Sequence, residues 1–283
     1  MRKMFNGYIY HFKDNDLQKI NIESQFKTLD EFLMNLPAGV YSTLRTVGNK
    51  KGIFQLTYHL HRLLESFQLA GYEFVYSIYD LKLPLHEIIS REKGTEVRLR
   101  IFLPFDSPQI CYLLTEELTQ PSISDYQNGV KVGINRLTRD NPRAKLTSFI
   151  HRSEKIKSYC KENNLEESIM VNKKDELLEG LSSNFFAIKE GKIFTAEYDV
   201  LKGSIREILL DVIRSNNIPL VLKPIHLNDL NTIEEAFITS TSRAVLPVVQ
   251  IGDVIIGEGK PGQITTFLGK NFNERMMTEA EFV

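Results

Sequence analysis

The 283-residue sequence lacks several features that mark well-known classes of protein. It has two cysteines, Cys111 and Cys160, with no CxxC pair and no histidine pair at ligand spacing, which argues against a disulfide scaffold or a metal site. No apolar run approaches the roughly 20 residues of a membrane helix. The N-terminal stretch MRKMFNGYIYHFKDND contains no apolar core of signal-peptide length. We therefore expect a cytoplasmic protein without a bound metal.

An excess of charge of one sign is also missing. The formal net charge is −1, and no stretch collects lysine and arginine, so binding to nucleic acid or to a membrane has no electrostatic support. The composition, 42% hydrophobic and 25% charged residues, is typical of one large domain or two of middling size. GEGKPG (257–262) matches GxGxxG, but Pro261 and the short chain that follows leave no space for a dinucleotide-binding unit.

Helical and strand patterns mix along the chain without a regular βαβ order, which favours an α+β fold with two domains. The polar segment 119–129 contains Pro121 and ends in Asn-Gly, so it is predicted to connect an N-terminal domain (1–118) to a C-terminal domain (130–283). A long helix is predicted over roughly 143–164. A second helix is predicted over 203–217, where Ser204 and Glu207 match a capping box.

Several polar groups occur where they could bind a small anion. The helix start at Ser204 offers backbone amides and a helix dipole, and the run Thr239–Ser242 follows a strand end. Two such groups of donors, without a Walker lysine, indicate a bound phosphate whose ester is not cleaved. Arg62 lies beside the apolar stripe of a predicted helix, and Lys145 follows Pro142 near a helix start. Taken singly, each feature has an ordinary explanation as a capped helix, a polar turn or a solvated charge.

Taken together and in order, five segments resemble the class IV pyridoxal-phosphate aminotransferases of fold type IV. These segments are HLHRL, the lysine after NPRA, EGLSSNFF, LKGSIRE and EEAFITSTS, and the resemblance covers roughly residues 37–270. The family includes branched-chain and D-amino-acid aminotransferases and 4-amino-4-deoxychorismate lyase. The resemblance implies a smaller N-terminal α/β domain and a larger C-terminal domain with a mixed, barrel-like sheet and flanking helices. It also implies a pyridoxal 5′-phosphate cofactor and a homodimer.

The resemblance assigns roles to individual residues. Lys145 matches the catalytic lysine that forms a Schiff base with the cofactor, and Arg62 matches the arginine on the phosphate. Glu179 matches the acid on the pyridine nitrogen, where a carboxylate keeps the ring protonated and able to accept negative charge from the substrate. The other implied cofactor-binding residues are Ser182, Leu201, Ser204, Ile205, Ser240 and Thr241. The positions that match substrate-binding residues are Tyr41 and Arg98.

The sequence also departs from the family pattern, which leaves the substrate open. The helix start reads Gly-Ser-Ile-Arg where Gly-Ile-Thr-Arg is more frequent, and Phe149 occupies the region in which many branched-chain members have a tyrosine. The substrate loop after the strand of Arg98 lacks the Arg-Gly pattern of D-amino-acid and lyase members. Three functions remain: an aminotransferase for an amino acid and a 2-keto acid, a 4-amino-4-deoxychorismate lyase that releases pyruvate, and a silent cofactor-binding dimer. Lys145 and Glu179 argue against the silent form, and we expect an aminotransferase, with branched-chain amino acids among the candidate substrates.

Overall fold

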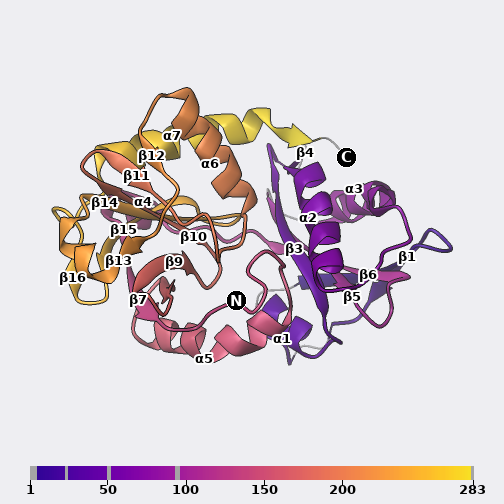
Figure 1. The fold of residues 1–283 in the computed structure, drawn as a ribbon. Helices are drawn as coiled ribbons and strands as arrows, with labels where there is room; N and C mark the ends of the chain where they lie inside the picture. The colour runs from indigo at the N-terminus through magenta and orange to yellow at the C-terminus, as the bar shows by residue number, and fades with distance from the viewer. Residues whose placement is uncertain (1–4, 23–24, 50–51, 93–95, 282–283) are drawn as a thin grey trace. The chain divides into compact units, whose positions relative to one another are not determined.

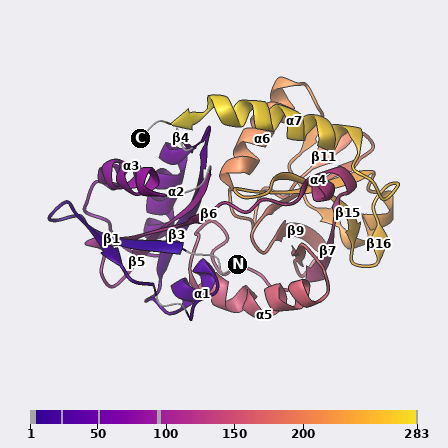
Figure 2. The ribbon, with the colours of Figure 1, turned by 180° about the vertical axis from the view of Figure 1, so that it is seen from behind.

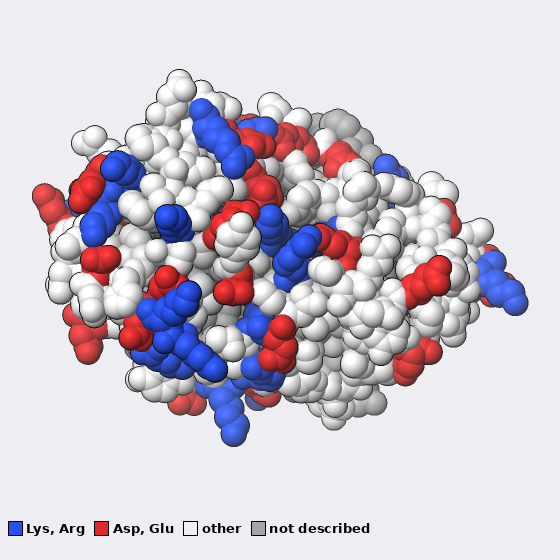
Figure 3. All heavy atoms as spheres, viewed as in Figure 1, with Lys and Arg blue, Asp and Glu red and all other residues white. Residues whose placement is uncertain are grey.

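The structure is a computed structural model that describes residues 5–22, 25–49, 52–92 and 96–281 (Figure 1). The chain divides into two compact units: residues 1–119, 144–152 and 276–283 form the first, and residues 120–143 and 153–275 form the second. Both units contain helices and strands, which confirms the predicted α+β class. Within the described ranges, no helix has the length and apolar character needed to cross a bilayer. Lysine and arginine alternate with acidic residues over the face drawn in Figure 3.

The two units differ from the predicted domains in two segments. Residues 144–152, assigned above to the C-terminal domain, belong to the first unit, and residues 145–147 among them pair with β3 (Gly39–Val47). The Tyr41 amide donates to the Lys145 carbonyl at 3.0 Å, and the Thr147 amide donates to the Gly39 carbonyl at 3.0 Å. Residues 276–283 also belong to the first unit, where β17 (Ala280–Glu281) pairs with β4 (Gly52–Phe54). Pairing between such distant segments has no local signal in the sequence.

The first unit is built on a seven-stranded sheet with the strand order β17-β4-β3-β5-β6-β1-β2. Its other strands are β1 (Phe5–His11), β2 (Asp16–Ile20), β5 (Val97–Pro104) and β6 (Ile110–Glu117). Its helices are α1 (Leu29–Met34), α2 (Leu56–Leu69), the 3-10 helix η1 (Ile78–Leu81) and α3 (Lys82–Arg91). The views of Figures 1 and 2 show α2 and α3 beside this sheet.

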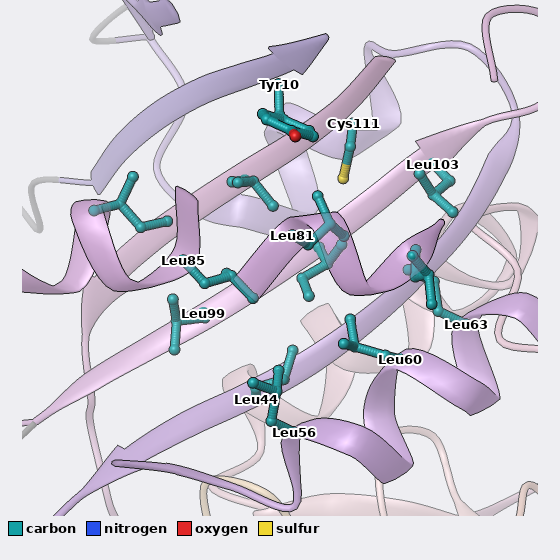
Figure 4. Packing of buried hydrophobic residues seen from close by; sticks show 14 of the residues in the cluster. Tyr10, Leu44, Leu56, Leu60, Leu63, Leu81, Leu85, Leu99, Leu103 and Cys111 are labelled. Carbon is teal, nitrogen blue, oxygen red and sulfur yellow. The ribbon is translucent and has the colours of Figure 1, made fainter. Parts of the chain in front are cut away.

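One apolar core joins α2, η1 and α3 to a single face of this sheet. Successive strand residues point to opposite faces, so Val40 and Leu44 of β3 enter this core while Tyr41 enters a second core shared with α1. Figure 4 shows the first core, in which leucines of the helices meet leucines of the strands: Leu56, Leu60, Leu63, Leu81 and Leu85 against Leu44, Leu99 and Leu103. Ser42 lies on the same strand face as Val40 and Leu44, so this polar residue faces α2.

The second unit contains a ten-stranded sheet in which six strands close on themselves. The closed ring runs β10-β14-β15-β7-β8-β9 and returns to β10 through the pair Asn184–Glu179, which confirms the predicted barrel-like domain. The ring strands are β7 (Val130–Asn135), β8 (Glu167–Val171), β9 (Glu176–Gly180), β10 (Asn184–Lys189), β14 (Glu235–Ser240) and β15 (Ala244–Ile251). The outer strands are β11 (Lys192–Phe194), β12 (Leu220–Val221), β13 (Ile225–His226) and β16 (Val254–Ile255). Apolar side chains of the ring strands form the core of this unit, among them Val132, Ile169, Phe185 and Leu246.

The remaining helices correct three details of the sequence analysis. They are α4 (Ile123–Asn128), α5 (Ser148–Glu162), α6 (Ser204–Ser215), η2 (Leu227–Thr232) and α7 (Gln263–Thr278). The predicted connection therefore contains α4, whose capping box is formed by Ser122 and Asp125, and the helix predicted over 143–164 is the shorter α5. The capping box predicted for Ser204 is wrong, because Gly203 is the N-cap of α6 and Glu207 accepts a hydrogen bond from Arg206 at 2.6 Å.

Candidate active site

Lys145 lies in the segment that pairs with β3, in the first unit. Its carbonyl accepts a hydrogen bond from Tyr41 at 3.0 Å, and its amide donates to Oγ of Ser66 on α2 at 3.1 Å. Nζ lies 4.8 Å from the centre of the Tyr41 ring, which is a cation–π distance. The backbone of Lys145 is therefore held from two sides, and its ammonium group contacts the face of a ring that is itself 9% exposed.

Arg62 is buried on α2 within a group of polar side chains. Its Nη2 donates to Oγ of Ser42 at 3.1 Å and to Nδ1 of His59 at 3.2 Å. The carbonyl of Arg62 accepts a hydrogen bond from Ser66 Oγ at 2.8 Å, so Ser66 connects Arg62 to the backbone of Lys145. Burial, followed by the charges of Arg62 and Lys145, holds the pKa of His59 well below its ordinary value of 6.5. The structure therefore brings Lys145, Arg62 and Tyr41 together.

Arg98, the second predicted substrate residue, lies on β5 of the same unit. Its Nε is 3.1 Å from a carboxylate oxygen of Glu116, and the Arg98 side chain is 26% exposed. Arg100, two residues along the same strand face, forms an ion pair with Asp30 and contacts the Tyr41 ring at 5.1 Å. Both arginines thus have carboxylate partners within the first unit, and contact between Arg98 and a substrate stays a prediction.

Glu179 is the last residue but one of β9, in the second unit, and it is 1% exposed. Oε1 accepts a hydrogen bond from Nε of Arg139 at 2.7 Å. Oε2 accepts from Nδ2 of Asn184 and from the Leu201 amide, each at 3.1 Å. Asn184 also donates to the Leu201 carbonyl at 2.7 Å. This carboxylate therefore has a fixed orientation, and Leu201, a predicted cofactor-binding residue, contacts it through its backbone.

Ser182, also predicted to bind the cofactor, lies in the turn after β9. Its amide and its hydroxyl both donate to Oε1 of Glu167, each at 2.7 Å, and Ser183 donates to the other oxygen of the same carboxylate. Nη1 of Arg243 donates to Ser182 Oγ at 3.0 Å, and Nε of Arg243 donates to Glu166 at 2.6 Å. The small residues after Glu179 therefore connect this turn to β8 and to the turn that follows β14.

The predicted phosphate-binding residues of the second unit lie at two element ends. Ser204 and Ile205 are the first residues of α6, and both are buried. Ser240 ends β14, and its hydroxyl accepts hydrogen bonds from the amide and Nη1 of Arg243 at 3.3 and 3.4 Å; Thr241 follows. Next to Ser240, the Thr239 hydroxyl is buried and has no hydrogen-bond partner among the described residues.

Sequence reasoning missed the residues that hold the predicted ones. In the first unit these are His59, Ser42 and Ser66, and in the second they are Arg139, Asn184, Glu167 and Arg243. The sequence could have indicated the polar group on α2, because His59, Arg62 and Ser66 are polar residues at helical spacing within the apolar face of this helix. Arg139 has no such signal, since it meets Glu179 from 40 residues away. Lys145 and Glu179 belong to different units, so a shared ligand stays a prediction.

Comparison with known proteins places the chain in a family. A profile of the family described as amino-transferase class IV matches residues 39–251. A Thermotoga maritima protein named as a branched-chain-amino-acid aminotransferase is 28% identical over 252 residues, which cover 85% of this chain and 87% of that protein. The D-alanine aminotransferase of Staphylococcus haemolyticus is 25% identical over 293 residues, which cover 97% and 98% of the two chains.

A solved structure agrees with these matches. The crystal structure of a Thermotoga maritima protein, titled as a branched-chain amino acid aminotransferase, has a TM-score of 0.77 at 25% identity and covers 96% of each chain. The fold type IV architecture expected from the sequence is therefore confirmed. Since the profile spans most of the sequence, the chain belongs to the class IV aminotransferases, a family of enzymes that use pyridoxal 5′-phosphate.

Proposed function

We propose that the chain moves an amino group between a branched-chain amino acid and a 2-keto acid, with Lys145 as the residue that carries the cofactor. The observation that best supports this assignment is the fixed backbone of Lys145, which hydrogen bonds to Tyr41 and Ser66 on its two sides. A lysine that leaves and rejoins a cofactor must return to one position in every cycle, and a held backbone favours that return.

The polar groups of the two units match the three parts of pyridoxal 5′-phosphate. Arg62 is a buried cation for the phosphate, Glu179 is a buried carboxylate for the ring nitrogen, and Lys145 is an amine for the aldehyde. Among the described residues, the buried Thr239 hydroxyl has no hydrogen-bond partner, and Thr239 precedes Ser240 at the end of β14. A buried hydroxyl without a protein partner is uncommon, and a phosphate oxygen would satisfy it. The residues present therefore fit this cofactor.

Each residue has a task in the proposed reaction. When bound, pyridoxal 5′-phosphate supplies an electron-withdrawing ring that stabilises negative charge at the substrate α-carbon. Glu179 would accept a hydrogen bond from the ring nitrogen and so keep a proton on it. Lys145 would accept the α-proton on Nζ and donate a proton back later in the exchange. Arg62 would hold the phosphate through charge-assisted hydrogen bonds.

Replacing Lys145 tests the assignment. The wild-type protein is expected to be yellow, and borohydride should discharge its long-wavelength absorbance. Lys145→Ala should lose this absorbance and about 10³-fold of the turnover rate, the order of magnitude of general acid–base catalysis. Lys155→Ala, which removes an exposed lysine of α5, is the matched control and should behave as wild type. A Lys145→Ala protein with unchanged absorbance and activity would refute the proposal.

The substrate is tested separately from the lysine. The names of the related proteins, branched-chain and D-alanine aminotransferases, support an amino acid as the donor. Leucine, D-alanine and aminodeoxychorismate should be compared as donors, with 2-oxoglutarate as acceptor. We expect leucine to be the best donor. Release of pyruvate from aminodeoxychorismate without any keto acid would identify a lyase instead. The homodimer and the cytoplasmic location expected from the sequence stay predictions.

A further inference from the structure

His59 is the most deeply buried titratable group near the proposed site, and the proposed reaction gives it no task. It is 0% exposed, as is Ser42, and both lie between α2 and the face of β3 on which Val40 and Leu44 are packed. A buried imidazole in an apolar core is costly unless its nitrogens are used. The contacts of Nδ1 indicate what this imidazole does.

Nδ1 of His59 accepts hydrogen bonds and carries no proton. Nη2 of Arg62 lies 3.2 Å from it, and an arginine nitrogen can only donate. Ser42 Oγ lies 2.9 Å from the same nitrogen, so the hydroxyl donates to Nδ1, whose single lone pair it shares with Nη2 of Arg62, and accepts from Nη2 at 3.1 Å. The imidazole and the hydroxyl thus form two acceptors that meet the same guanidinium nitrogen.

We propose that His59 is a positioning residue for Arg62: its Nδ1, with the Ser42 hydroxyl, fixes Nη2 and so sets the orientation in which the guanidinium binds the cofactor phosphate. The inference rests on the proposed function, in which Arg62 is a phosphate ligand. An arginine side chain has several rotatable bonds, and their freedom is lost when it binds a ligand. Two acceptors that hold one nitrogen beforehand reduce that loss. A protonated imidazole would repel Arg62 and could not accept its hydrogen bond.

The test compares ligands with and without a phosphate. Equilibrium dissociation constants for pyridoxal 5′-phosphate and for pyridoxal should be measured with cofactor-free protein, by absorbance titration. His59→Leu should weaken binding of pyridoxal 5′-phosphate about tenfold, the scale of a hydrogen bond to a charged group, and leave pyridoxal unchanged. His59→Asn should bind both ligands within about twofold of wild type, because the asparagine carbonyl can accept in place of Nδ1.

Two further variants test whether His59 orients Arg62 or only fills space in the core. Ser42→Ala removes the second acceptor with little change in volume, and it should weaken only pyridoxal 5′-phosphate, by about threefold. His59→Leu in an Arg62→Ala background should have no further effect, because the residue that His59 orients is gone. Thermal unfolding of each cofactor-free variant shows whether it is folded, and Ser42→Ala keeps the test open if His59→Leu does not fold.

The outcomes distinguish this inference from the proposed function. If Arg62→Ala weakens pyridoxal and pyridoxal 5′-phosphate equally, Arg62 is not a phosphate ligand; the role proposed for Arg62 then falls together with the inference on His59, while the assignment of Lys145 is tested separately. Suppose instead that Arg62→Ala weakens binding of pyridoxal 5′-phosphate alone. If His59→Leu then weakens both ligands alike, or if the effect of His59→Leu is the same in the Arg62→Ala background as in wild type, His59 only fills the core. The proposed function then stands and the inference is overturned.

Discussion

At the scale of the residue, Glu179 combines deep burial with a full set of donors. The donors to its two oxygens include Nε of Arg139, Nδ2 of Asn184 and the amide of Leu201. A carboxylate buried in this way is tolerated only when its charge and lone pairs are compensated, and Arg139 supplies the charge. The same contacts fix the direction of the oxygens before any ligand binds, which is the property required of an acceptor for a ring N–H.

The burial of His59 makes stability depend on pH. Burial and the charges of Arg62 and Lys145, the charged groups that act on it, hold the pKa of His59 well below 6.5 in the folded chain. The unfolded chain binds this proton near pH 6.5, and the folded chain does not. The contribution of neutral His59 to stability is therefore complete above about pH 6.5 and falls at lower pH, by up to about 1.4 kcal/mol per pH unit.

Urea unfolding between pH 7.5 and 5.0 measures this contribution when wild type is compared with His59→Asn. Asparagine does not titrate, so the free energies of unfolding of the two proteins should converge as the pH falls. A difference that stays constant over this range would mean that the imidazole keeps its ordinary pKa, and the predicted depression would be wrong.

At the scale of the element, the turn between β9 and β10 depends on a single glycine. The amide of Gly180 donates to the Ser183 carbonyl at 2.9 Å, and Glu167 of β8 accepts from both serines of the turn. A Cβ atom at position 180 would lie 2.4 Å from Oε2 of Glu167 and 2.3 Å from Oγ of Ser183. The close approach of this carboxylate therefore requires the absence of a side chain at Gly180.

Gly180→Ala should lower the free energy of unfolding by about 2 kcal/mol, as expected for overpacking. It should also weaken binding of pyridoxal 5′-phosphate, because Glu179 is the preceding residue. Gly269→Ala is the matched control: it lies inside α7, where the added Cβ would meet Val245 at an ordinary 3.8 Å, and it should raise stability by about 1 kcal/mol. Equal stability of Gly180→Ala and wild type in urea unfolding would show that Glu167 can move aside.

At the scale of the whole molecule, local sequence patterns predict where helices and strands lie, but they do not predict which distant segments contact each other. The helix that carries Arg62 and the helix predicted over 203–217 are present as α2 and α6, because apolar periodicity acts over a few residues. The pairing of residues 145–147 with β3, the ion pair between Arg139 and Glu179, and the closure of six strands each join distant segments. No short window of sequence contains that information.

The same long-range organisation leads to a prediction for the whole chain. Each unit has its own apolar core, and the proposed cofactor ligands are divided between them, with Lys145 and Arg62 in the first and Glu179 in the second. A ligand held by both units should stabilise both, by about 2.7 kcal/mol at a hundred times its dissociation constant. Amide hydrogen exchange should therefore slow in β3 and α2 and also in β9 and β10 when pyridoxal 5′-phosphate is added.

Hydrogen exchange followed by mass spectrometry can resolve these segments, and two variants sharpen the result. Lys145→Ala and Glu179→Gln each remove a proposed ligand from one unit, so each should reduce the protection of both units rather than of its own alone. This reciprocity follows because one ligand that binds two units couples their opening, and weakening either contact lowers the common binding free energy. Protection confined to the first unit in wild type would mean that Arg62 and Lys145 bind the cofactor without Glu179, and the assignment of Glu179 to the ring nitrogen would have to be abandoned.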